Sequence, residues 1–556
     1  MQKQNGRTEK NSSFVKQAGI LAAAGIISRI IGLLYRSPLT GIIGDEGNGY
    51  YSFAYNIYTI ILLIASYSIP SAISKVMAQK MAYGEYRDAQ KILKCAFVYV
   101  CVVGGAAAVF AYFAAPHLVV ANAVPVLRIF APTIFLSGLL GVLRGYFQAH
   151  RTMVPTSTSQ ILEQCVNASV SIGAAWFFIH HTDLIRFAPA GTEEETAAFI
   201  SGACGSALGT GAGVLTALIF MTILFIRDGN TRDAEYRMDR IHKESTFREM
   251  NRNLLMVVTP FIISTFIYNF STSLNQTVYS KFMMEVRGLT QESAAHLYGV
   301  FSGKAVVIAN IPIAFSSAMA AAVIPSIATA FAKKDRKTTL HRISLATKVT
   351  MLIAIPCSVG LFVLSRPVMQ LLFPQKASLD MASAILRALS ITVVFYSLST
   401  LSNAVLQSVG KVNSPMFHAA ISLVVQALIL VGGLNLFGEE NSVYALVLAQ
   451  MAYSLMMCIL NELAVRKYLH FRQRPQRVFI LPFIASFAMG AAAFALYHLV
   501  ELAVPSNLLG LVVSIPLSGL LYFALIIKTH AVTAAQLQQI PKGDVVLKFA
   551  KKLRLL

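Results

Sequence analysis

The sequence contains few charged residues for its length. Only 13% of the 556 residues are Asp, Glu, Lys or Arg, whereas 56% are hydrophobic and the mean hydropathy is +0.63. A soluble chain of this size would carry roughly 25% charged residues. This scarcity excludes a soluble globular protein, and we predict an all-α polytopic membrane protein.

Tryptophan and cysteine are also scarce. The single Trp stands against 21 Tyr and 34 Phe, so tyrosine is expected to supply most of the aromatic belts at the membrane interfaces. The six cysteines fall inside apolar runs and lack the paired spacing that metal or redox chemistry requires. We therefore expect buried thiols, no metal site and no cofactor.

Acidic residues are much rarer than basic ones, with 25 Asp and Glu against 46 Lys and Arg. A cytoplasmic N-terminus puts 34 of these basic residues in eight inner segments and seven within or beside spans. This dispersal follows the positive-inside rule, predicts that both termini are cytoplasmic, and argues against a nucleic-acid partner. Five basic residues remain for the outer loops: Arg186, Lys281, Arg287, Arg366 and Lys376.

Apolar runs recur along the whole chain. Because about 20 apolar residues cross the ~30 Å hydrocarbon core, we count fourteen candidate transmembrane helices. The glycine-rich stretch at 44–51 is expected to be the outer loop between the first two. The predicted spans are 17–42, 50–77, 92–115, 122–148, 156–180, 198–226, 253–283, 297–331, 344–365, 381–408, 415–437, 442–465, 478–500 and 506–528.

The sequence also repeats itself. Span 4 reads VLRIFAPTIFLSGLLGVLRGYFQ and span 10 reads ILRALSITVVFYSLSTLSNAVLQ, so that Arg128 aligns with Arg387 and Gln148 with Gln407. Duplication of the arginine favours an architectural role for it. The predicted parts are a six-helix half over 1–226, a cytoplasmic linker over 227–250, a second six-helix half over 251–467, two additional helices over 478–528, and a basic amphipathic cytoplasmic tail over 529–556.

Four segments together carry a family resemblance. They read GIISRIIGLLYRSPLTGIIGDEGNGYYSFAYNIY, RGYFQ, SQILEQ and VIPSIAT. With them, nearly the whole chain resembles the MurJ-like branch of the MOP flippase superfamily, which includes the stage V sporulation protein B and YtgP-type polysaccharide biosynthesis proteins of bacteria. The resemblance implies a bacterial plasma-membrane protein whose halves form a V-shaped bundle around a cationic cavity, and extra helices 13 and 14 beside a groove for a lipid tail.

Three basic residues inside spans are the predicted binding site. Arg36 matches a basic cavity position of the family, although Ser37 follows it where Gram-negative relatives carry an aspartate. Lys304 matches the basic residue of span 8 and has no counterpart in the other repeat, where Gly49 stands. Arg29 lies near mid-membrane, where a charge is costly and needs a partner. We expect these three to bind a diphosphate, with snorkelling or structural bonding as the alternatives.

A fourth arginine has an acidic neighbour. Arg144 and Glu163 lie at similar depth on the antiparallel spans 4 and 5, on either side of the turn at Arg151. We predict that they form a structural ion pair. A proton-coupling role for Glu163 is the alternative.

The resemblance implies a flippase that moves a polyprenyl-diphosphate-linked cell-wall precursor, above all lipid II, to the outer leaflet. Its expected partners are the lipid-linked oligosaccharide and the membrane, and coupling to Na+, H+ or the membrane potential stays open. Alternatives are a flippase for capsule or teichoic acid precursors and a MATE-like cation-coupled drug antiporter. A glycosyltransferase is disfavoured because no nucleophile, metal or phosphate-loop constellation is present, so we predict no enzyme activity.

Overall fold

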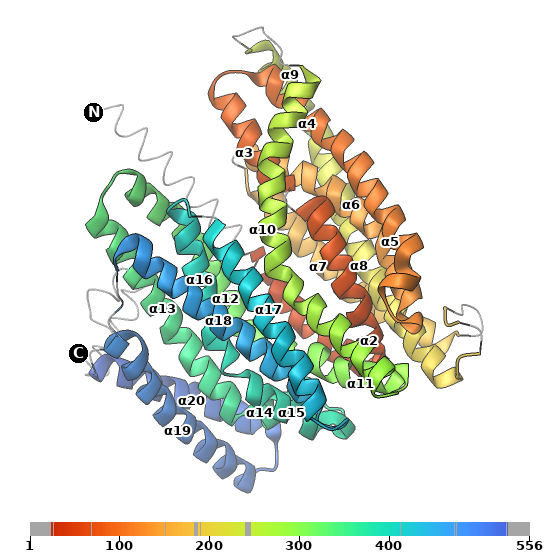
Figure 1. Ribbon diagram of the computed structural model, residues 1–556, viewed down its shortest axis with the longest axis vertical. Coiled ribbons are helices and arrows are strands. Elements are labelled where there is room, and N and C mark those ends of the chain that lie inside the picture. The colour runs from red at the N-terminus through yellow and green to blue at the C-terminus, as the bar shows by residue number, and fades with distance from the viewer. Residues whose placement is uncertain are drawn as a thin grey trace. The chain divides into compact units, whose positions relative to one another are not determined.

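The computed structural model describes residues 24–531 except 26, 68, 151, 183–186, 190, 240–245, 412, 472, 474 and 530. Every regular element within these ranges is helical, which confirms the predicted all-α class. The chain packs as two compact units, Met1–Gly299 and Val300–Leu556 (Figure 1). The predicted repeat boundaries at 226 and 251 stay a prediction, and the predicted tail lies almost wholly outside the described residues.

Unit 1 is a bundle of long helices. Its helices are α2 (Arg36–Leu62), α3 (Ile69–Ala82), α4 (Tyr86–Tyr99), α5 (Gly105–Leu118), α6 (Val124–Ala149), α7 (Val154–His180), α8 (Glu194–Arg227), α9 (Gly229–Arg237), α10 (Phe247–Lys281) and α11 (Gln291–Gly299). Residues 27–34, before α2, are also helical. Wide π-helical turns continue several of these helices, at Leu63–Tyr67, Val100–Gly104 and Phe282–Val286.

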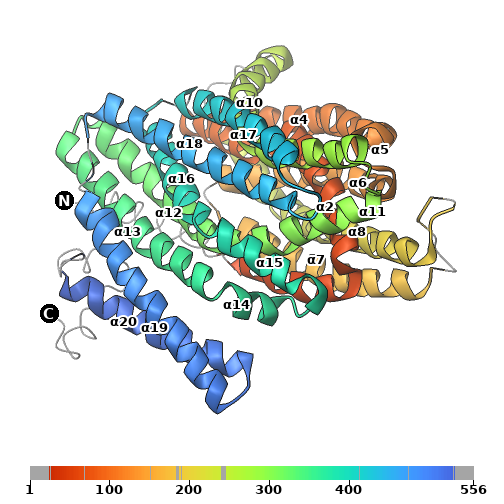
Figure 2. The same ribbon diagram turned by 60° about the horizontal axis from the view of Figure 1, so that its bottom comes forward.

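Unit 2 is a second bundle. It begins with a π-helical segment, Val300–Ala305, and a further π-helical turn at Gln476–Ile480 precedes α19. The last two helices, α19 and α20, run side by side and pack through α19 against α13 (Figure 2). Its helices are α12 (Val306–Ala332), α13 (Arg336–Val363), α14 (Ser365–Leu372), α15 (Lys376–Leu389), α16 (Thr392–Ser408), α17 (Asn413–Leu436), α18 (Val443–Leu469), α19 (Leu481–Ala503) and α20 (Asn507–Lys528).

Within the described residues, nine helical stretches are long and apolar enough to cross a membrane. A tenth crossing results if α15 and α16, which meet at a 44° bend, form one span. These helices show a multi-pass membrane protein, while the count of fourteen stays a prediction. The nine stretches are Tyr86–Leu118, Ala121–Ala149, Glu194–Arg227, Gln291–Ser317, Arg336–Val363, Asn413–Leu436, Val443–Leu469, Gln476–Ala503 and Asn507–Lys528.

The expected outer loop over 44–51 is much shorter than predicted, because two helical segments meet at Gly44 and residues 45–51 are helical. Helix α2 is interrupted only at Gly44, whose φ of 67° and ψ of −178° lie in a region that only glycine adopts readily. Helical structure resumes at Asp45, and most of the stretch up to Tyr51 is buried. A glycine-rich polar sequence reads as a loop, but here the missing side chains allow close packing instead.

Close backbone contact also joins α7 to α8. Gly205, Gly209 and Gly213 recur every four residues along α8 and so share one helix face. A Cβ atom at Gly209 would lie 2.1 Å from the Oγ of Ser171, and one at Gly213 would lie 2.5 Å from the carbonyl oxygen of Glu163. Stripes of small residues let membrane helices approach this closely. The stripe therefore fixes the backbone that carries Glu163.

Adding one methyl group to this stripe should destabilise unit 1. We expect Gly209→Ala to lower the unfolding free energy by about 1–3 kcal/mol, as overpacking of a dense core does. Gly105→Ala is the matched control, because a Cβ there meets nothing within 4 Å. Thermal unfolding of the purified protein measures both variants. Equal melting temperatures for the two would contradict the close packing of α7 and α8.

Candidate functional site

An aromatic cluster lies inside unit 1. Tyr51, Tyr55 and Tyr58 recur at intervals of four and three residues, which puts them on one face of α2. Tyr51 stacks on Tyr55 with ring centroids 5.5 Å apart, and Tyr58 stacks on Phe130 of α6 at 4.7 Å. These four residues are called the tyrosine cluster below. It supplies phenol hydroxyls within an otherwise apolar bundle.

Arg36 lies against the tyrosine cluster. Its guanidinium hydrogen-bonds to the side chain of Tyr35 and interacts electrostatically with Tyr51 and Tyr55. The two groups belong to segments of α2 on opposite sides of Gly44, so the break in the helix determines how they meet. A guanidinium beside hydroxyl groups offers several hydrogen-bond donors, which is the chemistry that binds phosphate oxygens.

Arg29 lies in a different environment. It belongs to the helical residues 27–34 and its side chain is exposed, whereas Arg36 is half-buried. Ile27 and Ile30 beside it are also exposed, at 44% and 49%. Arg29 therefore lies on a part of its helix that unit 1 does not bury, and its binding role stays a prediction.

Arg144 and Glu163 face each other across α6 and α7. The Nη2 of Arg144 lies 2.7 Å from the Oε2 of Glu163, and its Nε donates to the Oγ of Ser159 at 2.9 Å. Glu163 is also within electrostatic range of Tyr55 and Tyr58. Whether this pair is purely structural stays a prediction.

Lys304 lies in unit 2. It belongs to the π-helical segment Val300–Ala305, and its side chain is only 1% exposed. Its Nζ donates to the Oγ of Ser378, near the start of α15, at 2.7 Å. Burial of an ammonium is costly without polar partners, so this contact stabilises the charge. The wide turn aims the side chain at α15, and wide turns of this kind often occur at functional sites.

The predicted site residues thus fall in two units, with Arg29, Arg36, Arg144 and Glu163 in unit 1 and Lys304 in unit 2. Sequence reasoning missed the tyrosine cluster, although the spacing within YYSFAYNIY would have indicated a one-sided aromatic face. Among the described residues, no three His, Cys, Asp or Glu side chains are grouped as metal ligands would be.

A helical membrane bundle that holds guanidinium and ammonium groups beside hydroxyl groups can bind an anion within the membrane. The family described as lipid II flippase MurJ matches residues 91–514. The chain belongs to this family. Lipid II flippase MurJ of Bacillus subtilis is 23% identical over 80% of this chain and 81% of its own length. The stage V sporulation protein B of the same organism is 24% identical over 74% of this chain and 76% of its own.

Solved structures show the same fold. The lipid II flippase MurJ in an inward closed conformation covers 91% of this chain and 97% of its own, with a TM-score of 0.62 and 15% identity. An inward-facing multidrug resistance MATE family transporter of the MOP superfamily covers 81% of this chain and 95% of its own, with a TM-score of 0.55 and 14% identity. The resemblance to the MOP flippase superfamily is confirmed.

Family membership settles the class of activity. The chain is a membrane transporter of the flippase type for a lipid-linked substrate, and it is not a catalytic enzyme. The glycosyltransferase alternative is therefore wrong. The sequence had already disfavoured it, because it shows no nucleophile, metal or phosphate-loop constellation.

Removing one member of the Arg144 and Glu163 pair should cost more stability than removing both. Glu163→Gln leaves the guanidinium without its carboxylate, and Arg144→Met leaves the carboxylate without its guanidinium. We expect a coupling free energy of about 1–3 kcal/mol from a double-mutant cycle measured by thermal unfolding. Additive effects of the two substitutions would show that the pair does not stabilise unit 1.

Proposed function

We propose that the protein flips a polyprenyl-diphosphate-linked cell-wall precursor, lipid II first among them, from the inner to the outer leaflet by alternating access. Arg36 carries the proposal, because it combines a half-buried guanidinium with neighbouring phenol hydroxyls in a bundle of apolar helices. Lys304 and Arg29 are kept as further proposed diphosphate-binding residues on the basis of their positions within spans of the sequence. Lipid II is also the cargo named for the family that the chain matches.

The two phosphate-binding groups differ in how they would release cargo. Arg36 offers a planar fork that binds phosphate oxygens in pairs, whereas Lys304 acts as a point charge. In this structure the Nζ of Lys304 donates to the Oγ of Ser378, and an incoming diphosphate would compete for this donor. A phosphate oxygen that accepts from an ammonium forms a charge-assisted hydrogen bond, which is stronger than the bond to a hydroxyl.

The proposed orientation favours outward movement of an anion. Both termini are taken as cytoplasmic in a bacterial plasma membrane, with two six-helix halves over 1–226 and 251–467. When the membrane potential is negative inside, moving one negative charge from the inner to the outer side is favoured by roughly 2.3 kcal/mol per 100 mV. We therefore infer that the membrane potential contributes to driving outward movement of the cargo. Coupling to Na+ or H+ is the alternative that the structural similarity to a MATE family transporter suggests.

A related cargo is the second candidate. The stage V sporulation protein B matches the chain about as well as the B. subtilis lipid II flippase does, at 24% against 23% identity. A role in sporulation, or a capsule or teichoic acid precursor as cargo, would use the same diphosphate site. Native mass spectrometry of the purified protein would identify the lipid-linked species that stays bound to it.

Growth of a strain depleted of its own lipid II flippase tests the site. We expect the unmodified protein to restore growth and Arg36→Ala and Lys304→Ala to fail. Loss of one hydrogen-bonded charge should weaken diphosphate binding roughly ten- to hundredfold. Lys333→Ala is the control, because Lys333 is an exposed cation beyond the end of α12.

Membrane levels and melting temperatures of the variants separate loss of transport from loss of folding. If both alanine variants restore growth at normal membrane levels, the assignment of the site is wrong. If the unmodified protein itself fails while it is present and folded, lipid II is not its cargo.

A further inference from the structure

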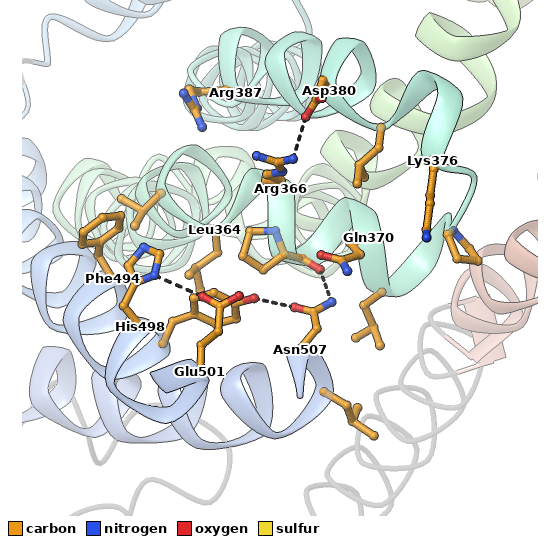
Figure 3. A pocket seen from close by; sticks show the side chains of 17 residues that line it. Leu364, Arg366, Gln370, Lys376, Asp380, Arg387, Phe494, His498, Glu501 and Asn507 are labelled. Atoms are coloured by element: carbon orange, nitrogen blue, oxygen red, sulfur yellow. Dashed lines mark hydrogen bonds and ion pairs between the residues drawn. The ribbon is translucent and has the colours of Figure 1, made fainter. Parts of the chain in front are cut away.

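A pocket of about 830 Å³ opens in unit 2 where several helices end (Figure 3). Its walls come from the end of α13, from α14 and α15, from the last turns of α19 and from the start of α20. In Figure 3 the labelled side chains of α14 and α15 face those of α19 and α20. The candidate spans Arg336–Val363 and Gln476–Ala503 end here, and Asn507–Lys528 begins here. The pocket therefore lies at one membrane boundary.

Basic residues collect in this pocket. Arg366, Lys376 and Arg387 line it, against two acidic residues, Asp380 and Glu501. Arg366 and Lys376 are two of only five basic residues that the sequence assigns to outer loops. Basic residues are rare on that side of membrane proteins, so their convergence on one pocket requires an explanation.

The bonds that these side chains make leave them able to bind an anion. Arg366 pairs with Asp380 at 3.1 Å, but both side chains are exposed, at 61% and 81%, and such pairs exchange partners at little cost. Arg387 donates through its Nε to the Oγ of Ser365 at 3.3 Å. A guanidinium has five N–H donors, so both arginines keep donors for phosphate oxygens.

The equivalent arginine of the first repeat has no such surroundings. Arg128 donates to the carbonyl oxygen of Tyr112 at 3.4 Å and lies over its ring. Arg128 thus bonds to a residue within the last turns of α5, whereas Arg387 bonds to Ser365, just beyond the end of α13. Arg387 also lines the pocket that α14, α15, α19 and α20 form.

The floor of the pocket is fixed by its own contacts. The hydroxyl of Tyr497 donates to the Oδ1 of Asn507 at 2.9 Å, and the Nδ2 of Asn507 donates to the carbonyl oxygen of Pro367 at 3.0 Å. These bonds join α19 and α20 to α14. These contacts hold the helix ends that line the pocket in fixed positions, and binding sites are commonly pre-formed in this way.

One side of the pocket is apolar and open. Phe494 and Leu508 line it and are 54% and 55% exposed, and Leu502 and Val512 nearby are 85% and 58% exposed. Exposed apolar side chains on a membrane-spanning helix face lipid tails. An occupant with an anionic head and an apolar chain would contact the arginines and these side chains together.

We propose that this pocket binds the phosphate headgroup of an anionic membrane lipid, with the lipid chain along the exposed face of α19 and α20. Phosphate suits the pocket because two arginine forks can bind its oxygens in pairs. The inference does not depend on the transported cargo proposed above. The resemblance implies a groove for a lipid tail beside these two helices, and the new element is a basic headgroup pocket formed where they meet α14 and α15.

A fluorescent reporter placed in the pocket tests the proposal. Trp176, the single tryptophan, is replaced by Phe, and Phe494→Trp puts the only indole at the pocket wall. The full chain is reconstituted in phosphatidylcholine vesicles, and phosphatidylglycerol with brominated chains is added. We expect saturable quenching at low mole fractions, with brominated phosphatidylcholine as the reference for random contact.

Charge variants in the reporter background give opposite predictions. Arg366→Gln with Arg387→Gln should weaken binding of phosphatidylglycerol by more than about tenfold, since each basic residue beside an anionic lipid contributes roughly fivefold. Asp380→Asn should strengthen binding several-fold, because it removes the competing carboxylate. Arg336→Gln with Lys337→Gln is the matched control at the other end of α13, and we expect it to bind as the unmodified reporter does.

Three results would overturn the proposal. Quenching by phosphatidylglycerol and phosphatidylcholine could be equal, which would mean that the pocket does not select anionic headgroups. Arg366→Gln with Arg387→Gln could bind like the control pair. Soluble inorganic phosphate at millimolar concentration could displace the lipid completely, which would identify a free-anion site instead. The gain expected from Asp380→Asn keeps the test decisive, because misfolding cannot produce it.

Discussion

Every charge inside an apolar helical bundle must be bonded by its neighbours, and this requirement shapes both units. An unpaired charge at mid-membrane costs at least about 2.5–3.5 kcal/mol. The structure meets the requirement differently at each site. Arg36 hydrogen-bonds to the phenol of Tyr35. Arg144 pairs with the carboxylate of Glu163 and donates to a serine, and Lys304 donates to the hydroxyl of Ser378.

The kind of partner determines what each charge can do. A charge held by a carboxylate is already neutralised, so Arg144 contributes little net field around it. Charges held by neutral hydroxyls keep their full electrostatic attraction for an anion in a low-dielectric surrounding. The Arg36 guanidinium, which hydrogen-bonds to the phenol of Tyr35, belongs to this second kind, and for this reason we propose Arg36 rather than Arg144 for the anionic cargo.

Composition and charge distribution predicted the helical membrane class, because it depends on averages over many residues. The family was indicated by the resemblance of four sequence segments, which averages do not carry. The helix ends were harder to predict. GDEGNGYY reads as a loop from composition, yet only Gly44 leaves the helix, because the neighbouring glycines permit burial. Among the site residues, depth in the membrane indicated Arg144 with Glu163. The environment of Lys304 depends on a π-helical turn, and hydrophobic periodicity carries no signal for one extra residue in a turn.

The glycine stripe of α8 has a mechanical consequence. Where Gly205, Gly209 and Gly213 meet α7, the contact is largely made by backbone and short side chains. Such a surface has almost no rotamers to rearrange, so it cannot repack into a second stable arrangement. During a transport cycle α7 and α8 should therefore move as one stiff body. The strain of any conformational change must then fall on other joints, where helices are widened or interrupted, as at Gly44 and Leu63–Tyr67.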